Sequence, residues 1–200
     1  MEAGLSENTT LRSLKRWLRR EEQSILSNAD VFSRLYETSH LIVFRYIYGL
    51  SGGPLQEAED ITGETYTRAW QARHRFNGNE NSALGWLLQI AHNLVIDRSR
   101  RQKTRGETED NFSIDSLVDP SQIPEMDVMT REQVATLWRM LEPLNTDVRE
   151  MLVLRYILGW QVRHIAAQLD MNENNVTVTI KRTLKSLQRD WPQSQEQGNE

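Results

Sequence analysis

The side chains best suited to chemistry in this sequence gather in a short C-terminal segment, residues 161–187. Amides and a hydroxyl come first and cations follow, all off the apolar stripe of a predicted helix: Asn174, Asn175, Thr177, Lys181, Arg182 and Lys185. Amide groups can pair with the edges of bases, and cations attract phosphates. The segment therefore predicts contact with nucleic acid.

Two short helices must position these side chains. The first has four apolar residues at helical spacing and the second has another four: Val162, Ile165, Ala166 and Leu169, then Val176, Ile180, Leu184 and Leu187. Asn172 lies between them and is a good N-cap for the second helix. The pattern is typical of a helix-turn-helix, whose second helix enters the major groove. The alternative is an ordinary helical hairpin with a solvated basic face.

Composition excludes several classes of protein. The chain has no cysteine, which argues against disulfide frameworks, zinc fingers and thiol catalysis. Its four histidines share no metal-ligand spacing with carboxylates, and no phosphate-binding glycine loop or nucleophile motif is present. We therefore expect no enzymatic activity, no cofactor and no metal. With no long apolar run and no signal-peptide core, we expect a cytoplasmic protein that does not enter the membrane.

The net charge of the chain is −4, but its charged residues are unevenly distributed along the sequence. Residues 106–136 hold one arginine and eight carboxylates, whereas the segments on either side are weakly basic. This acidic middle contains two prolines and few apolar residues, so it favours a linker. The predicted organisation is an N-terminal extension (1–29), a first module (30–105), a flexible acidic linker (106–130), a second module (131–191) and a disordered tail (192–200).

The first module is predicted to be helical throughout. A first amphipathic helix runs from about Val31 to Tyr48 and ends at the glycines from Gly49 onward. A second helix covers residues 57–70, a polar loop covers 74–85, and a third helix covers 86–105. The fold class is thus all-α, with two small helical domains.

Two charged faces stand out in this module. The second helix presents Glu57, Asp60, Glu64 and Arg68 at spacings of three and four, which by themselves predict only a solvated face. The third helix ends with five cations in eight residues, between Arg98 and Arg105. Cations suit a helix C-terminus, but they also form a phosphate-binding patch beside the polar loop.

In this order the segments resemble an extracytoplasmic-function (ECF) sigma factor of the sigma-70 family. Three stretches carry the resemblance: AEDITGETYTRAW (58–70), the series from Phe76 through Trp86 to Arg101, and the stretch from Leu141 to Ala166. The resemblance covers most of the chain from Val31 to Trp191. It implies that the first module is sigma region 2 and the second is sigma region 4.

The resemblance also implies partners and sites. Region 2 would bind bacterial core RNA polymerase through Glu57, Asp60, Glu64 and Arg68. It would recognise and melt the promoter minus-ten element through its loop and third helix, at Arg75, Asn77, Asn79, Asn81, Trp86, Asn93, Arg98 and Arg101. The recognition helix of region 4 would bind the minus-thirty-five element through the six polar residues named first. Family members are commonly held inactive by an anti-sigma factor.

Two alternatives remain open at this stage. An autonomous helix-turn-helix regulator that binds duplex operators as a dimer explains residues 161–187, but it leaves the acidic helix and the cationic loop unused. Residues 11–26 form either a helix that packs on region 2 or a basic surface that binds a membrane or a regulator. We favour packing, because Glu21 and Glu22 weaken a membrane role.

Overall fold

The computed structural model describes residues 24–105 and 131–191, and within these ranges every regular element is a helix. The predicted acidic linker, the predicted tail and most of the N-terminal extension lie outside the described residues. No helix within the described residues is both long enough and apolar enough to cross a bilayer.

The first long helix is defined by its two caps. Helix α2 (Ala29–Ser51) begins where the Asn28 side chain accepts a hydrogen bond from the Asp30 amide at 2.8 Å. It ends at Gly52, which adopts a left-handed conformation with φ of 64° and donates its amide to Tyr48. Glycine accepts this conformation without strain, so it is the usual residue at a helix C-terminus. The helix predicted between Val31 and the following glycines is confirmed.

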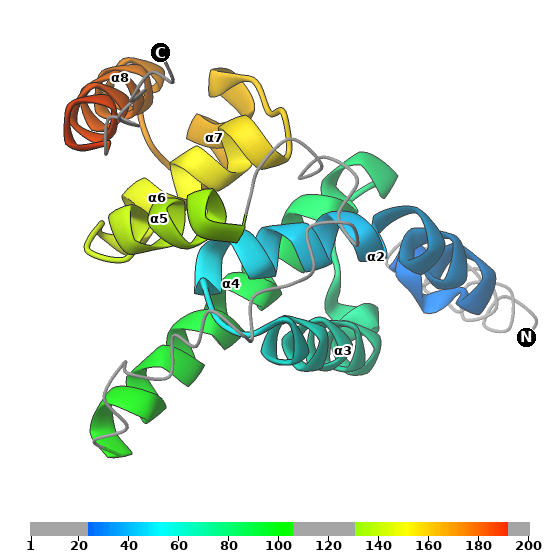
Figure 1. The fold of residues 1–200 in the computed structure, drawn as a ribbon. Coiled ribbons are helices and arrows are strands. Elements are labelled where there is room, and N and C mark those ends of the chain that lie inside the picture. Colours follow the sequence, from blue (N-terminus) through cyan, green and yellow to red (C-terminus); the bar gives the residue numbers. More distant parts are fainter. Residues whose placement is uncertain (1–23, 106–130, 192–200) are drawn as a thin grey trace, which may run out of the picture.

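Helices α3 (Leu55–Ala72) and α4 (Glu80–Arg105) pack with α2 into a three-helix unit (Figure 1). Its interior is made of side chains that are at most 2% exposed: Val43, Tyr46, Ile47, Leu50, Ala58, Ile61, Ala69, Ala83, Leu87, Leu88 and Ala91. The C-terminal half of α4 extends beyond the other two helices (Figure 1). The cationic end predicted from the sequence therefore lies on an arm that projects from the unit.

The polar loop is shorter than predicted. After a single 3-10 turn, η2 (Arg73–Arg75), α4 already begins at Glu80 instead of residue 86. The reason is local: the Asn79 side chain accepts a hydrogen bond from the Ser82 amide at 3.1 Å, which caps the helix. Ala83 is completely buried and anchors this first turn. The prediction that residues 80–85 form a loop was wrong.

The second module contains α5 (Arg131–Leu141), α6 (Thr146–Leu152), α7 (Val162–Gln168) and α8 (Glu173–Asp190). Helix α6 continues into a π-helical turn, η6 (Val153–Ile157), in which the Leu158 amide bonds to the Val153 carbonyl at 3.1 Å. These helices supply their own buried side chains: Met151, Leu152, Val153, Leu154, Ile165, Ala166, Val176 and Ile180.

Helices α7 and α8 form the predicted helix-turn-helix. Asp170 takes up a positive φ of 51°, and the Met171 amide bonds back to the Ala166 carbonyl at 2.8 Å, which ends α7. The Asn172 side chain then accepts from the Asn174 amide at 2.8 Å and begins α8. The predicted cap at Asn172 is confirmed.

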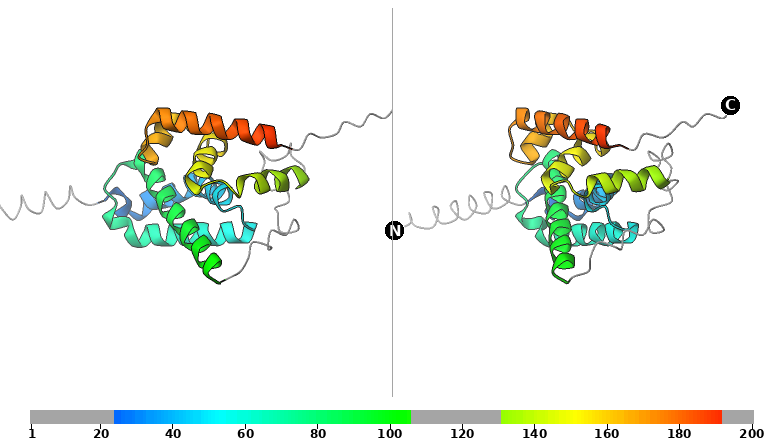
Figure 2. Two further views of the ribbon diagram at one scale, coloured as in Figure 1. Left: turned by 90° about the vertical axis from the view of Figure 1, so that its left-hand side faces the viewer. Right: turned by 60° about the vertical axis from the view of Figure 1, so that its left-hand side comes forward.

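The two modules pack directly against each other. Helix α2 contacts α6 and η6, and the views in Figures 1 and 2 agree that the second module lies beside α2. Gly49 allows the close approach, since a Cβ atom there would lie 2.7 Å from Ile157 Cδ1. The Tyr48 ring meets Trp138 edge-on, with 5.5 Å between centroids. One continuous apolar core therefore spans both modules.

Candidate polymerase and nucleic-acid interfaces

The acidic face of α3 contains one side chain that is held in place and two that are exposed. The side chain of Glu57 is only 15% exposed, and its Oε1 accepts from Arg98 Nε at 2.7 Å and from Gln102 Nε2 at 3.2 Å. Asp60 and Glu64 are exposed, and Glu64 forms an ion pair with Arg68 one turn later. The structure therefore brings the four predicted residues onto one helix face, but only part of that face is open to a partner.

The segment before α4 presents polar groups to solvent. Arg75, Asn77, Asn79 and Asn81 are all exposed. Their roles in the local structure differ, because Asn79 caps α4 and Asn81 lies in the first turn of that helix. Asn77 lies in the remaining short loop and presents its amide with no part in the helix cap.

Trp86 on α4 packs against Phe76, which belongs to this loop. The indole is only partly buried and lies against Phe76, with 5.1 Å between ring centroids and a tilt of 45° between planes. Phe76 itself is 7% exposed. The two rings therefore fix the base of the loop, and a direct contact between Trp86 and DNA stays a prediction.

The remaining predicted residues of region 2 lie along α4. Asn93 and Arg101 are exposed, whereas Arg98 is about half exposed and bound to Glu57. This pairing connects a residue predicted to bind DNA with one predicted to bind polymerase. Neither prediction anticipated that the two side chains contact each other.

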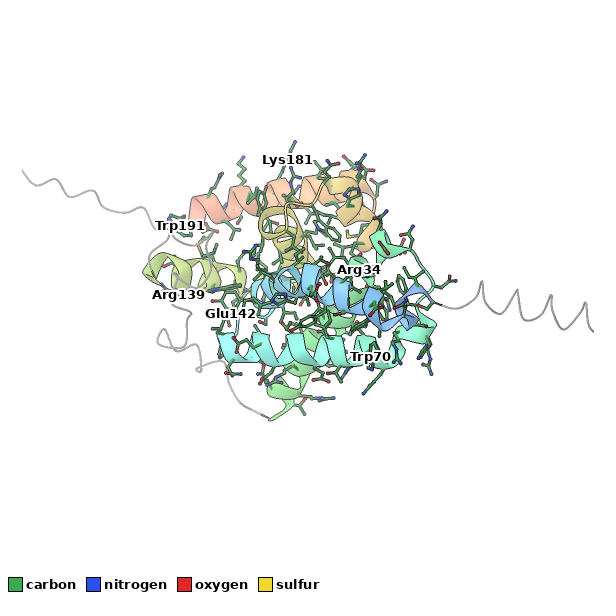
Figure 3. The ribbon with its side chains drawn as sticks, turned by 90° about the vertical axis from the view of Figure 1, so that its right-hand side faces the viewer. Arg34, Trp70, Arg139, Glu142, Lys181 and Trp191 are labelled. Carbon is green, nitrogen blue, oxygen red and sulfur yellow. The ribbon has the colours of Figure 1, made fainter. Side chains whose placement is uncertain are left out.

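The recognition helix presents its polar face outward. Val176 and Ile180 dock the helix, while Asn174 and Asn175 are exposed at its start. Lys181, Arg182 and Lys185 are exposed further along, and Figure 3 shows Lys181 pointing away from the molecule. Thr177 is half-buried, and its hydroxyl donates to the Glu173 carbonyl at 2.8 Å, which leaves its methyl group as the part available to a partner.

The α3 and α8 faces lie on opposite sides of the molecule, as the views in Figures 2 and 3 agree. Each is therefore accessible without the other being covered.

Within the described residues, no group of three or more His, Asp or Glu side chains could hold a metal ion.

A polar cluster between the modules was not predicted from the sequence. Tyr46 on α2 donates its hydroxyl to Glu150 Oε1 on α6, 2.5 Å away. The other oxygen of this carboxylate, Oε2, lies 3.0 Å from Nδ1 of His92 on α4. Burial, together with the neighbouring carboxylate, raises the pKa of Tyr46 well above its usual range. The hydroxyl therefore stays protonated and acts as a donor.

The same carboxylate also shifts the pKa of His92. Bonding to Glu150 raises the pKa of His92, while partial burial acts in the opposite direction. Asp147 on α6 adds a further attraction for the protonated ring. Glu150 is only 3% exposed, so a protonated His92 supplies the opposite charge that this buried carboxylate needs.

Two more hydrogen bonds join the modules. Arg149 donates to the Leu50 carbonyl at the end of α2 at 3.0 Å. Gln168 on α7 donates its amide to the Gly85 carbonyl on α4 at 3.0 Å. The sequence does contain one signal of this interface: Arg149 and Glu150 directly precede the apolar run from Met151 to Leu154.

Comparison with known families assigns both modules. Residues 35–105 match the family model for sigma-70 region 2, and residues 135–187 match the model for sigma-70 region 4. The chain belongs to the sigma-70 family. Together the two regions cover more than half of the chain and fall in the order that the sequence predicted.

Two relatives of this sigma-70 chain are ECF sigma factors. The ECF RNA polymerase sigma factor BldN of Streptomyces coelicolor is 31% identical over 171 residues, which cover 86% of this chain and 64% of BldN. The ECF RNA polymerase sigma factor SigX of Bacillus subtilis is 29% identical over 163 residues, which cover 80% of this chain and 83% of SigX. This chain thus spans somewhat under two thirds of BldN.

Solved structures share the fold. The sigma factor RpoE from Bartonella quintana, in complex with the anti-sigma factor NepR, superposes with a TM-score of 0.60 at 22% identity. That likeness covers 79% of this chain and 94% of RpoE. CnrH, in complex with the cytosolic domain of CnrY, gives a TM-score of 0.56 at 20% identity over 82% of this chain and 92% of CnrH.

Proposed function

We propose that this chain is a promoter-specificity subunit that binds bacterial core RNA polymerase and directs promoter recognition, melting and initiation of transcription. The observation that carries the proposal is the presence of both sigma-70 regions in one chain, each with an exposed polar face on an opposite side. The subunit is a regulator without catalysis of its own, and it acts in the cytoplasm.

Region 2 binds the polymerase through the acidic face of α3. Asp60 and Glu64 are the exposed carboxylates that meet the basic clamp helices of the largest subunit. Arg68 and Glu57 flank them, and the ion pair between Arg98 and Glu57 fixes the edge of this surface. Surface charges of opposite sign steer association and set the partner, even where each pair adds little affinity.

Region 2 also holds the melted strand of the minus-ten element. A base that leaves the duplex loses stacking and pairing, and polar loop groups offset that loss by bonding to the base edge. These groups come from four exposed residues beside the Phe76 and Trp86 rings: Arg75, Asn77, Asn79 and Asn81. Asn93, Arg98 and Arg101 continue along α4 as a track for the phosphates.

Region 4 reads the minus-thirty-five element with α8. Asn174, Asn175 and Thr177 lie in its first turns, where a recognition helix meets base edges. Lys181, Arg182 and Lys185 lie further along, where the groove wall presents phosphates. The docking stripe, from Val176 onward, keeps this face turned outward.

An anti-sigma factor is a further partner. Among solved structures that share this fold, the sigma factor RpoE was captured with the anti-sigma factor NepR, and CnrH with the cytosolic domain of CnrY. A protein of this kind would hold the present chain away from the polymerase.

The test is run-off transcription with purified core polymerase on genomic fragments, followed by mapping of the start sites. The chain should be required for initiation at a defined set of promoters that share two upstream elements. Tight operator binding by the free protein as a dimer, with no effect of core polymerase, would instead identify an autonomous regulator.

A further inference from the structure

The residues just before α2 form a small element of their own. Helix η1 (Ile25–Ser27) is a single 3-10 turn, and the Ser24 side chain caps it by accepting from the Leu26 amide at 3.2 Å. The Ser27 amide bonds back to the Ser24 carbonyl at 2.9 Å, and Asn28 then caps α2. The conformation of this segment, residues 24–28, is therefore set locally, and we call it the anchor.

The anchor is attached to region 2 by a buried side chain. Leu26 is 1% exposed and belongs to the apolar core, whereas its neighbour Ile25 is exposed. Burial of apolar surface is the main force that holds such an element in place. The anchor contacts both α2 and η2. The match to the family model for region 2 begins at residue 35, so the family assignment does not account for this element.

A hydrogen bond joins the anchor to the strand loop, residues 75–79, which is part of the segment proposed to hold the melted strand. The Ser27 hydroxyl and Nδ1 of His74 are 2.8 Å apart, although the two residues are 47 positions apart in the chain. His74 is the central residue of η2, and Arg75 follows it directly. The anchor therefore holds the turn from which the strand loop begins.

The residues on either side of this contact are attached to the three-helix unit. The Arg73 guanidinium lies over an indole of α3, 3.7 Å from the ring centroid, and Phe76 packs against an indole of α4. Between these attachments, His74 and Arg75 are exposed. Within the described residues, the hydrogen bond to the anchor is the only one that the His74 side chain makes. The direction in which η2 presents Arg75 therefore depends on the anchor.

We propose that the anchor positions the strand loop for promoter melting, with Leu26 and Ser27 as its positioning residues. Neither side chain touches DNA; Ser27 acts through His74, and Leu26 fixes the anchor to the core. The proposal rests on the proposed function for its consequence in melting, but not for its effect on the loop. A loop that is already held in its binding conformation loses less conformational entropy when a base enters it. Loss of the anchor should therefore weaken open-complex formation and spare the binding of core polymerase and of closed duplex.

The first arm of the test measures order in the strand loop of the free, full-length protein by amide hydrogen exchange. The Phe76 amide bonds to the Arg73 carbonyl at 3.3 Å, so its exchange reports opening of η2. Ser27→Ala should speed this exchange about two- to tenfold, which corresponds to the loss of one hydrogen bond. Ser27→Thr keeps the hydroxyl and should restore slow exchange. Ser33→Ala, at an exposed position of α2, is the matched control. Unchanged exchange in Ser27→Ala would overturn the proposal.

A double-variant cycle tests whether Ser27 acts through His74. Ser27→Ala and His74→Ala each remove the same hydrogen bond, so the two changes together should speed exchange at Phe76 no more than either one alone. Effects that multiply would mean that the two side chains act independently, and would contradict the assigned contact.

Two truncations separate the anchor from the residues before it. Removal of residues 2–23 leaves the anchor whole, and removal of residues 2–27 leaves only Asn28, which still caps α2. Exchange at Phe76 should be unchanged in the first protein and faster in the second than in Ser27→Ala, because Leu26 is lost as well. Thermal unfolding shows whether the shorter protein folds, and the point variants decide the question if it does not. Equal exchange in two folded truncations would contradict the role of the anchor.

The second arm measures the consequence at a promoter identified by run-off transcription. With holoenzyme containing Ser27→Ala, permanganate footprinting should show the ratio of open to closed complexes reduced about two- to tenfold. Ser27→Thr and Ser33→Ala should leave this ratio unchanged, and all three variants should retain core polymerase in pull-down. Full melting by Ser27→Ala despite faster loop exchange would overturn the role in melting.

Two further outcomes are distinct from these. Loss of polymerase binding by Ser27→Ala would show that the anchor stabilises region 2 as a whole, and would also overturn the proposal. Absence of transcription with every form, the unmodified chain included, would contradict the proposed function and leave the exchange result standing.

Discussion

Arg98 on α4 donates its Nε to Glu57 on α3 at 2.7 Å, so the residue proposed to follow the DNA strand is bound to one proposed to face the polymerase. Gln102 adds a second donor to the same oxygen at 3.2 Å. The two surfaces of region 2 therefore share one ion pair. Consequently, a change at Glu57 affects both surfaces, and the polymerase contact is tested more cleanly at Asp60 and Glu64.

Reversal of the exposed carboxylates should abolish binding to core polymerase. Asp60→Lys with Glu64→Lys turns the acidic face basic, while exposed positions of this kind change the free energy of unfolding by only about 0.5 kcal/mol. Pull-down of core polymerase and thermal unfolding measure the two effects. Glu59→Lys is the control, because Glu59 is exposed on α3 about 100° around the helix from Asp60. Undiminished pull-down by the folded double variant would leave the acidic face with no role beyond solvation.

Two neighbouring asparagines should separate strand recognition from helix stability. Asn77→Ala should impair open-complex formation with an unchanged melting temperature, since Asn77 lies in the exposed loop. Asn79→Ala should impair both, because it also removes the cap of α4 at a cost of about 1 kcal/mol. Permanganate footprinting reports melting, and calorimetry reports stability. Full permanganate reactivity with Asn77→Ala would locate base recognition elsewhere in region 2.

The two ends of α8 should behave differently toward promoter sequence. Asn175→Ala should alter which minus-thirty-five sequence is preferred, by about 1–3 kcal/mol if the amide makes a bidentate contact with a base. Lys181→Ala should weaken binding to all promoters alike and reduce the salt dependence by about one charge. Holoenzyme binding to a promoter library at several salt concentrations measures both. If Lys181→Ala changes the preferred sequence, the cations read bases and the proposed register of α8 is incorrect.

The contact between His92 and Glu150 should make stability depend on pH. The pKa of His92 is raised in the folded chain, so its contribution is complete below its unfolded pKa of about 6.5 and is lost as pH rises through the folded value. The difference in melting temperature between the natural chain and His92→Gln should therefore be largest at mildly acidic pH and shrink toward pH 8. His164→Gln, at an exposed position, should show no such trend. A difference in melting temperature that grows with rising pH would contradict the ion pair.

The sequence predicts the local features of this fold well because they depend on neighbours in the chain. The cap at Asn172 and the glycine after α2 each act within a few residues, and the helical spacing of apolar side chains identifies the buried face of α8. The start of α4 was misplaced for a related reason. Residues 77–82 are polar enough to indicate a loop, yet Asn79 caps a helix and Ala83 anchors it.

The contact between the regions could not be predicted in the same way. Tyr46 and Glu150 are 104 positions apart, and neither lies in a pattern that specifies its partner. His92 is one of four histidines with no distinguishing neighbours in sequence. Only the packing of α2 against α6 brings these side chains together. The exposed polar faces that we propose bind partners were predictable from residue type, whereas the arrangement of the two regions required the structure.

Arg149 has a consequence for the order of events during synthesis. Its guanidinium bonds to the Leu50 carbonyl at the end of α2, from a position 99 residues later in the chain. At about 5–20 residues per second, a ribosome needs about 5–20 s to produce that separation. For that time the Leu50 carbonyl and the Tyr46 hydroxyl lack their partners from α6. Region 2 must therefore hold its three helices together while region 4 is still being made.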